Sequence, residues 1–195
     1  MRPLRHKDGH FDYGDYLSWP AGERWELLDG RAWACTGGEP EMAPPRRHQQ
    51  VLTALTAMLW QYFQGRSGQV YASPFEVRLT DAQDQVQAVV QPDLCVVTQL
   101  ARLDERGAIG APEWVLEVVS PLTVAHDFIR KLALYERHQV SEYWIVHPGD
   151  ETIQAYSLNE SGSYARPAVY SQGDTAHCQR FPGLHLDLKQ LFANS

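Results

Sequence analysis

The 195-residue sequence has few cysteines, no long hydrophobic run and no excess of positive charge. Its three cysteines, Cys35, Cys95 and Cys178, are widely separated, which argues against a zinc site or a disulfide framework. No apolar run is long enough to span a bilayer. The N-terminus has basic residues but lacks the apolar stretch of a secretory signal. The sequence therefore predicts a soluble protein of the cytoplasm.

The charge balance does not favour long-range attraction of nucleic acid. The formal net charge is −7 at pH 7, so the overall field repels a polyanion. Short basic clusters occur at residues 46–48 and 130–131, and each is more typical of a solvated surface than of a phosphate contact. Because bound cations reverse the local charge, we expect any affinity for DNA to be weak without a metal ion.

No repeat, linker or low-complexity tract divides the chain, and its length suits a single domain over residues 1–195. Apolar periodicity and the positions of Gly and Pro predict an ordered series of elements. These are a short helix at 11–19, a hairpin at 24–35, a helix at 48–63, strands at 70–79, 85–98 and 114–120, a helix at 127–138, and strands at 143–147, 152–158, 164–171 and 177–181. The order favours an α/β domain with a mixed sheet and helices on its faces.

Two apolar segments that resemble strands each carry one acidic residue. Asp93 follows Pro92 at the start of one, and Glu117 lies in the middle of the other. An ionised carboxylate in a buried strand costs roughly several kcal/mol unless a cation or hydrogen-bond donors compensate it. Neither segment contains Arg or Lys. On adjacent strands the two carboxylates could meet and hold a divalent metal. Each acid alone is equally compatible with a structural ion pair or a Pro-Asp turn.

The helix expected at residues 127–138 offers a cation. Asp127, Lys131 and Tyr135 fall at i, i+4 and i+8, along one edge of its apolar stripe. The alternative is an ordinary surface ion pair between Asp127 and Lys131. Because this edge borders the core side, the lysine stem can run along apolar surface and place its ammonium over the sheet. Lys131 is therefore the candidate cation, and Tyr135 is expected to be a core aromatic residue.

Together these residues resemble the Uma-type restriction endonuclease family of the PD-(D/E)XK superfamily. The resemblance rests on Pro92-Asp93, on the Glu-Val-Val-Ser-Pro segment at 117–121, on Asp127 with Lys131 and Tyr135, and on residues 140–146. It extends to residues 25–30, to His48 and to residues 182–188, and so covers nearly the whole chain.

The resemblance implies a restriction-endonuclease-like core of order αβββαβ, with a mixed sheet flanked by helices, an N-terminal hairpin and a C-terminal β extension. It also implies an endonuclease that uses Mg²⁺, or Mn²⁺ in its place, to hydrolyse phosphodiester bonds of nucleic acid, DNA in particular. The superfamily pattern puts a lysine two residues after the glutamate, where this chain has Val119. By resemblance, Lys131 takes that role from the following helix.

The resemblance assigns a role to each residue of the metal site. Asp93, Glu117 and the backbone carbonyl of Val118 would ligate the metal ion. Lys131 would orient the attacking water or stabilise the pentavalent intermediate. A homodimer is expected if both strands of a duplex are cut, because a two-fold axis matches the duplex symmetry.

Three further residues are secondary candidates. Glu26 could approach the same site from the N-terminal hairpin, or remain a carboxylate at its rim. His48, which follows two arginines at a helix start, could contact a phosphate or be incidental. Asp127 would hold Lys131 in position.

Two other function classes remain open. The protein could keep the fold but lack catalytic activity, and act as a binding or assembly module. Its six Trp and nine Tyr would then contact partner proteins. Such a protein would show no thermal shift with Mg²⁺ or Mn²⁺. Alternatively, the paired carboxylates could do acid and base work on a glycosidic bond, although a nearby lysine argues against that class.

Overall fold

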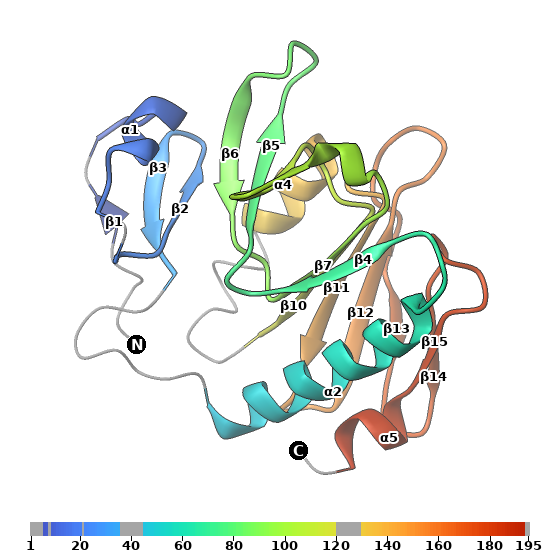
Figure 1. Cartoon of the computed structure of the whole chain (residues 1–195). Helices are drawn as coiled ribbons and strands as arrows, with labels where there is room; N and C mark the ends of the chain where they lie inside the picture. Colours follow the sequence, from blue (N-terminus) through green and yellow to red (C-terminus); the bar gives the residue numbers. More distant parts are fainter. Residues whose placement is uncertain (1–5, 8, 21, 36–44, 120–129, 194–195) are drawn as a thin grey trace.

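The computed structural model describes residues 6–7, 9–20, 22–35, 45–119 and 130–193, and Figure 1 shows two mixed sheets with helices on their faces. In this part of the chain, the first sheet has the strand order β1-β3-β2-β6-β5-β9-β8. Its strands are β1 (His6–Lys7), β2 (Trp25–Leu28), β3 (Arg31–Ala34), β5 (Glu76–Thr80), β6 (Val86–Val90), β8 (Leu103–Asp104) and β9 (Gly107–Ile109).

The second sheet has the order β13-β12-β11-β10-β7-β4, in which β10 and β11 are parallel and the other described neighbours are antiparallel. Its strands are β4 (Gln69–Ala72), β7 (Leu94–Val97), β10 (Trp114–Val118), β11 (Glu142–His147), β12 (Thr152–Ser157) and β13 (Ala168–Tyr170). The separate pair β14 (Thr175–His177) and β15 (His185–Asp187) follows.

Helices cover both faces of the second sheet because its strands are apolar on both sides. The long helix α2 (Arg46–Phe63) lies across one face, with α5 (Leu188–Phe192) beside it (Figure 1). On the other face, α4 (Leu132–Arg137) and the first sheet share one apolar core with β7 and β10. The described residues also include α1 (Tyr13–Leu17) and the 3-10 turn η1 (Leu100–Arg102). The expected α/β class with flanking helices is confirmed, although the described strands form two mixed sheets where the sequence predicts one.

Two strands predicted as continuous are each divided between the sheets. The segment predicted at 70–79 breaks at Ser73-Pro74 into β4 and β5, and the segment at 85–98 breaks at Pro92 into β6 and β7. Proline lacks the N–H that a central strand needs, so each break marks the place where the chain leaves one sheet for the other. The second break places Asp93 in the crossing segment, directly before β7.

Other boundaries follow the predictions more closely. The hairpin forms as β2 and β3, and α2 begins two residues before the expected helix start. The predicted helix at 127–138 is described from residue 130 onward, and its earlier part, including Asp127, lies outside the described residues. Of the two C-terminal segments expected as strands, 164–171 contains β13 and lengthens the second sheet, whereas 177–181 contributes only His177, at the end of β14 in the separate pair. In the described part of the chain, no helix is long and apolar enough to cross a membrane.

Candidate functional site

Asp93 and Glu117 lie at the same end of the second sheet. The register of the antiparallel pair β7 and β10 places Leu94 opposite Leu116. One step further along that register stand Asp93 and Glu117. The Val118 N–H donates to Asp93 Oδ2 at 2.8 Å, which fixes the carboxylate against the end of β10. The two acids are therefore neighbours across adjacent chain segments, which is the arrangement that the sequence pattern left open.

Glu117 is buried, with 4% of its surface exposed, and it meets a cation from the following helical segment. Lys131 Nζ donates to Glu117 Oε1 at 2.8 Å, and the Tyr135 hydroxyl donates to the same oxygen at 3.1 Å. Lys131 is itself only 4% exposed, so this is a buried ion pair. The structure thus brings the Lys131 ammonium to Glu117, as the sequence predicts.

The same ammonium also binds Glu26 from the N-terminal hairpin. Lys131 Nζ lies 3.0 Å from Glu26 Oε1, and that oxygen accepts a second hydrogen bond, at 2.8 Å, from the backbone N–H of Gln91. Glu26 is 5% exposed. Lys131 thus bridges Glu26 on the first sheet and Glu117 on the second, and the ion pairs connect the two sheets at the proposed site.

His48 reaches Asp93 from the opposite side. It lies in the first turn of α2, and its Nε2 is 3.3 Å from Asp93 Oδ2. Its buried Nδ1 has no hydrogen-bond partner in the described part of the chain. Asp93 therefore receives contacts from both His48 and the Val118 N–H, and α2 on one face and α4 on the other each contribute a residue to this end of the sheet.

Tyr135 is a site residue that the sequence reasoning undervalued. It was expected to be a core aromatic residue, and it is fully buried, yet its hydroxyl binds Glu117. Burial raises the pKa of Tyr135 well above its usual value, and the charge of Glu117 raises it further. The signal for this contact was its spacing of four residues from Lys131 on the same helical edge.

Basic residues stand around the acidic centre. The Arg130 guanidinium lies 3.9 Å from the centre of the Trp33 ring. Trp33 is opposite Glu26 in the β2–β3 register, so it lies on the same face as that carboxylate. On the side of His48, Arg47 pairs with Glu151 at 2.6 Å. Arg130 thus places positive charge at the edge of a site whose centre is acidic, whereas the charge of Arg47 is balanced by Glu151.

The donor set fits a hard divalent cation in its chemistry. Asp93, Glu117 and Glu26 offer carboxylate oxygens, which Mg²⁺ and Mn²⁺ prefer. Two of these carboxylates already share a cation, the Lys131 ammonium, so the fold holds positive charge at this position. Within the described ranges, no group of three or more His, Cys, Asp or Glu side chains is arranged around a common metal position. Metal ligation by Asp93, Glu117 and Val118 and a role for Asp127 stay predictions.

Glu142 shows how this fold buries an acid for purely structural reasons. It begins β11 with no exposed surface, and all of its described contacts are hydrogen-bond donors. These donors are Trp144 Nε1 at 2.7 Å, the backbone N–H groups of Arg180 at 2.7 Å and Gln179 at 3.2 Å, and the Cys178 thiol at 3.1 Å. Glu117 differs because the charge of a lysine, and not only neutral donors, compensates its carboxylate.

Replacing Glu142 with Leu is expected to lower the free energy of unfolding by about 3 kcal/mol or more, because several buried donors lose their acceptor. Glu142→Gln keeps one acceptor oxygen and should lose less. Urea unfolding followed by tryptophan fluorescence measures both. Equal stability of the Leu variant and the wild type would contradict the structural role.

Comparison with known proteins places this site in a family context. Residues 13–189 match the Uma2 family, which is described as "Putative restriction endonuclease". An uncharacterized protein of Synechocystis sp. is 24% identical over 153 residues, which cover 77% of this chain and 75% of that protein. The crystal structure of a putative nuclease belonging to DUF820 from Anabaena variabilis matches with a TM-score of 0.73 at 18% identity, over 94% of this chain and 98% of that one. The family match indicates a nuclease role, and the structural match supports the fold.

Proposed function

Because the chain belongs to the Uma2 family of restriction-endonuclease-like proteins, we propose that it is a metal-dependent endonuclease that hydrolyses phosphodiester bonds of DNA. This proposal rests on one observation. Lys131 forms ion pairs with both Glu117 and Glu26, and Asp93 lies next to them at the end of β10. Two acids on neighbouring segments can hold a metal ion, and a lysine from the next helical segment can stabilise the negative charge that develops on the phosphate.

Each residue has a distinct task in this proposal. Asp93 and Glu117 would hold Mg²⁺ or Mn²⁺, which when bound lowers the pKa of a water molecule and withdraws charge from the phosphate. Lys131 would donate a hydrogen bond to the attacking water or to a phosphate oxygen as negative charge develops. Tyr135 holds the Glu117 carboxylate, and His48 holds that of Asp93.

Glu26 would act through Lys131. In the present arrangement the ammonium is shared between Glu26 and Glu117. With a cation bound at the Glu117 carboxylate, Glu26 would remain as the anchor that keeps Lys131 close to the reacting phosphate. This gives Glu26 a positioning role, with no need for contact with substrate.

The closed ion-pair arrangement also favours one alternative. Lys131 could be a purely structural cation, in which case the protein would be a catalytically inactive nuclease fold that serves binding or assembly. The two functions differ in their response to divalent ions, because only an intact site gains stability from Mg²⁺ or Mn²⁺.

A cleavage assay tests the proposal. The purified protein is incubated with plasmid DNA, linear duplex, single-stranded DNA and RNA, with Mg²⁺, Mn²⁺ or a chelator. We expect cleavage of DNA with either ion, none with chelator, and none by a Glu117→Ala variant. Equal cleavage by the wild type and the variant would contradict the proposal, and only the similarity in fold and family would remain.

Three broader expectations stay predictions. These are the organisation of the chain as a single nuclease domain, the homodimer, and the cytoplasmic location. Light scattering at the concentration of the cleavage assay tests the dimer, and a monomer that cuts both strands of a duplex would contradict it.

A further inference from the structure

A polar pocket lies at the opposite end of the central strands from the acidic site. It has a volume of about 310 Å³ and is formed by segments from both sheets. Glu113, which lines it, precedes β10 by one residue, whereas Glu117 is four residues later in the same strand. At about 3.3 Å per residue, the two places are separated by roughly 13 Å along the strand. The pocket is therefore not a part of the proposed catalytic centre.

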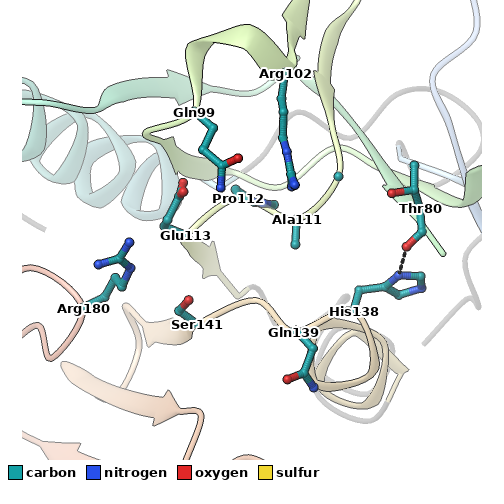
Figure 2. A pocket seen from close by; sticks show the side chains of 11 residues that line it. Thr80, Gln99, Arg102, Ala111, Pro112, Glu113, His138, Gln139, Ser141 and Arg180 are labelled. Atoms are coloured by element: carbon teal, nitrogen blue, oxygen red, sulfur yellow. Dashed lines mark hydrogen bonds between the residues drawn. The ribbon is translucent and has the colours of Figure 1, made fainter. Parts of the chain in front are cut away.

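Two arginines give the pocket its character. Arg102 follows the end of β7 and Arg180 comes from the C-terminal segment, and both line the pocket (Figure 2). Both are exposed, and in the described part of the chain no carboxylate lies within ion-pair distance of either guanidinium. The chain has a net charge of −7, so two such positively charged groups in one pocket differ from the overall charge of the protein.

In the described part of the chain, the acid in the pocket forms no ion pair with either arginine. Glu113 is buried, and its two oxygens accept hydrogen bonds from the Thr98 hydroxyl at 2.5 Å and the Thr98 N–H at 2.8 Å. His138 lines the pocket as well, with its Nδ1 at 3.1 Å from the Thr80 carbonyl oxygen. Burial lowers the pKa of His138, which favours the neutral ring. The positive charge of the pocket thus comes from Arg102 and Arg180.

The remaining lining groups can form hydrogen bonds. Gln99 and Ser141 present an amide and a hydroxyl on different sides of the pocket (Figure 2). Guanidinium groups bind phosphate and carboxylate through paired hydrogen bonds. A phosphate monoester carries nearly two negative charges at pH 7, which matches two guanidinium groups better than a single carboxylate does. The volume lies at the lower end of the range for small-molecule sites.

We propose that this pocket binds a small anion that carries a phosphate group, through Arg102 and Arg180. The phosphate group is the recognised chemistry, and it could belong to inorganic phosphate or to a nucleoside monophosphate. Gln99 and Ser141 would then distinguish the two, because only the nucleotide offers further polar atoms. This site does not depend on the nuclease proposal.

Isothermal titration of the full-length protein at constant ionic strength tests the site with inorganic phosphate and with AMP. We expect saturable binding of one equivalent, a loss of about tenfold or more in affinity for Arg102→Gln and for Arg180→Gln, and no change for Arg166→Gln. Arg166 is an exposed arginine outside the pocket. Binding should persist in Glu117→Ala, which separates this pocket from the acidic site.

Each outcome decides the proposal. Tighter binding of AMP supports recognition of a nucleotide, and equal binding supports recognition of the phosphate group alone. No saturable binding, or equal binding by the wild type and both arginine variants, would overturn the site. Binding of a single-stranded oligonucleotide without binding of either small anion would also overturn it, because the arginines would then serve a nucleic-acid strand.

Discussion

Replacing Lys131 with Met is expected to lower the free energy of unfolding of the metal-free protein by about 3–5 kcal/mol. The substitution keeps the length and apolar stem of the side chain but removes the ammonium that lies between Glu26 and Glu117. Both carboxylates are almost fully buried, so each would lose its compensating charge in a poorly solvated place. Urea unfolding in the presence of a chelator measures the loss.

A matched control separates this effect from the general loss of a lysine. Lys189 is an exposed lysine in α5, and Lys189→Met is expected to change stability by no more than about 0.5 kcal/mol. Mn²⁺ should recover part of the Lys131→Met loss, because a divalent cation that binds only the folded protein stabilises it. If Lys131→Met were as stable as the wild type, the carboxylates would be compensated by other means.

Glu117→Gln is expected to reduce the rate of metal-dependent DNA cleavage by about 10³-fold. The amide is nearly the same size as the carboxylate and can still accept hydrogen bonds from Lys131 and Tyr135, so the fold should survive. It loses the negative charge that a divalent ion requires. Single-turnover cleavage at saturating Mn²⁺ measures the effect, and circular dichroism checks the fold.

Glu113→Gln is the matched control for this variant. Glu113 is also a buried glutamate, directly before β10, but it binds Thr98 at the other end of the strand. Its replacement should alter stability and leave the cleavage rate within about twofold. Similar rate losses in both variants would show that stability, and not the charge at position 117, controls the activity.

Much of the candidate site could be predicted from the sequence, because it depends on short segments of the chain. An acid inside an apolar strand demands compensation, and Lys131 is the cation that the next helix brings to the same face. The spacing of Lys131 and Tyr135 was sufficient to place both on one helical edge, and both contact Glu117. Glu26 was the less certain candidate because a carboxylate in a hairpin has many possible environments.

The division into two sheets could not be anticipated in the same way. Hydrophobic alternation continues through Ser73-Pro74 and through Pro92, so the pattern indicated two long strands. Whether a proline ends a strand or only marks its edge depends on the partner strands, which are distant in sequence. The contact between His48 and Asp93 is likewise a tertiary one, between the start of α2 and the segment before β7.

A crystal of the protein soaked in Mn²⁺ and measured at the manganese absorption edge tests the central claim most directly. We predict an anomalous peak about 2–2.5 Å from carboxylate oxygens of both Asp93 and Glu117, with Lys131 still paired to Glu26. The absence of a peak there at saturating Mn²⁺, with Lys131 still shared between Glu26 and Glu117, would contradict the proposed metal-dependent site.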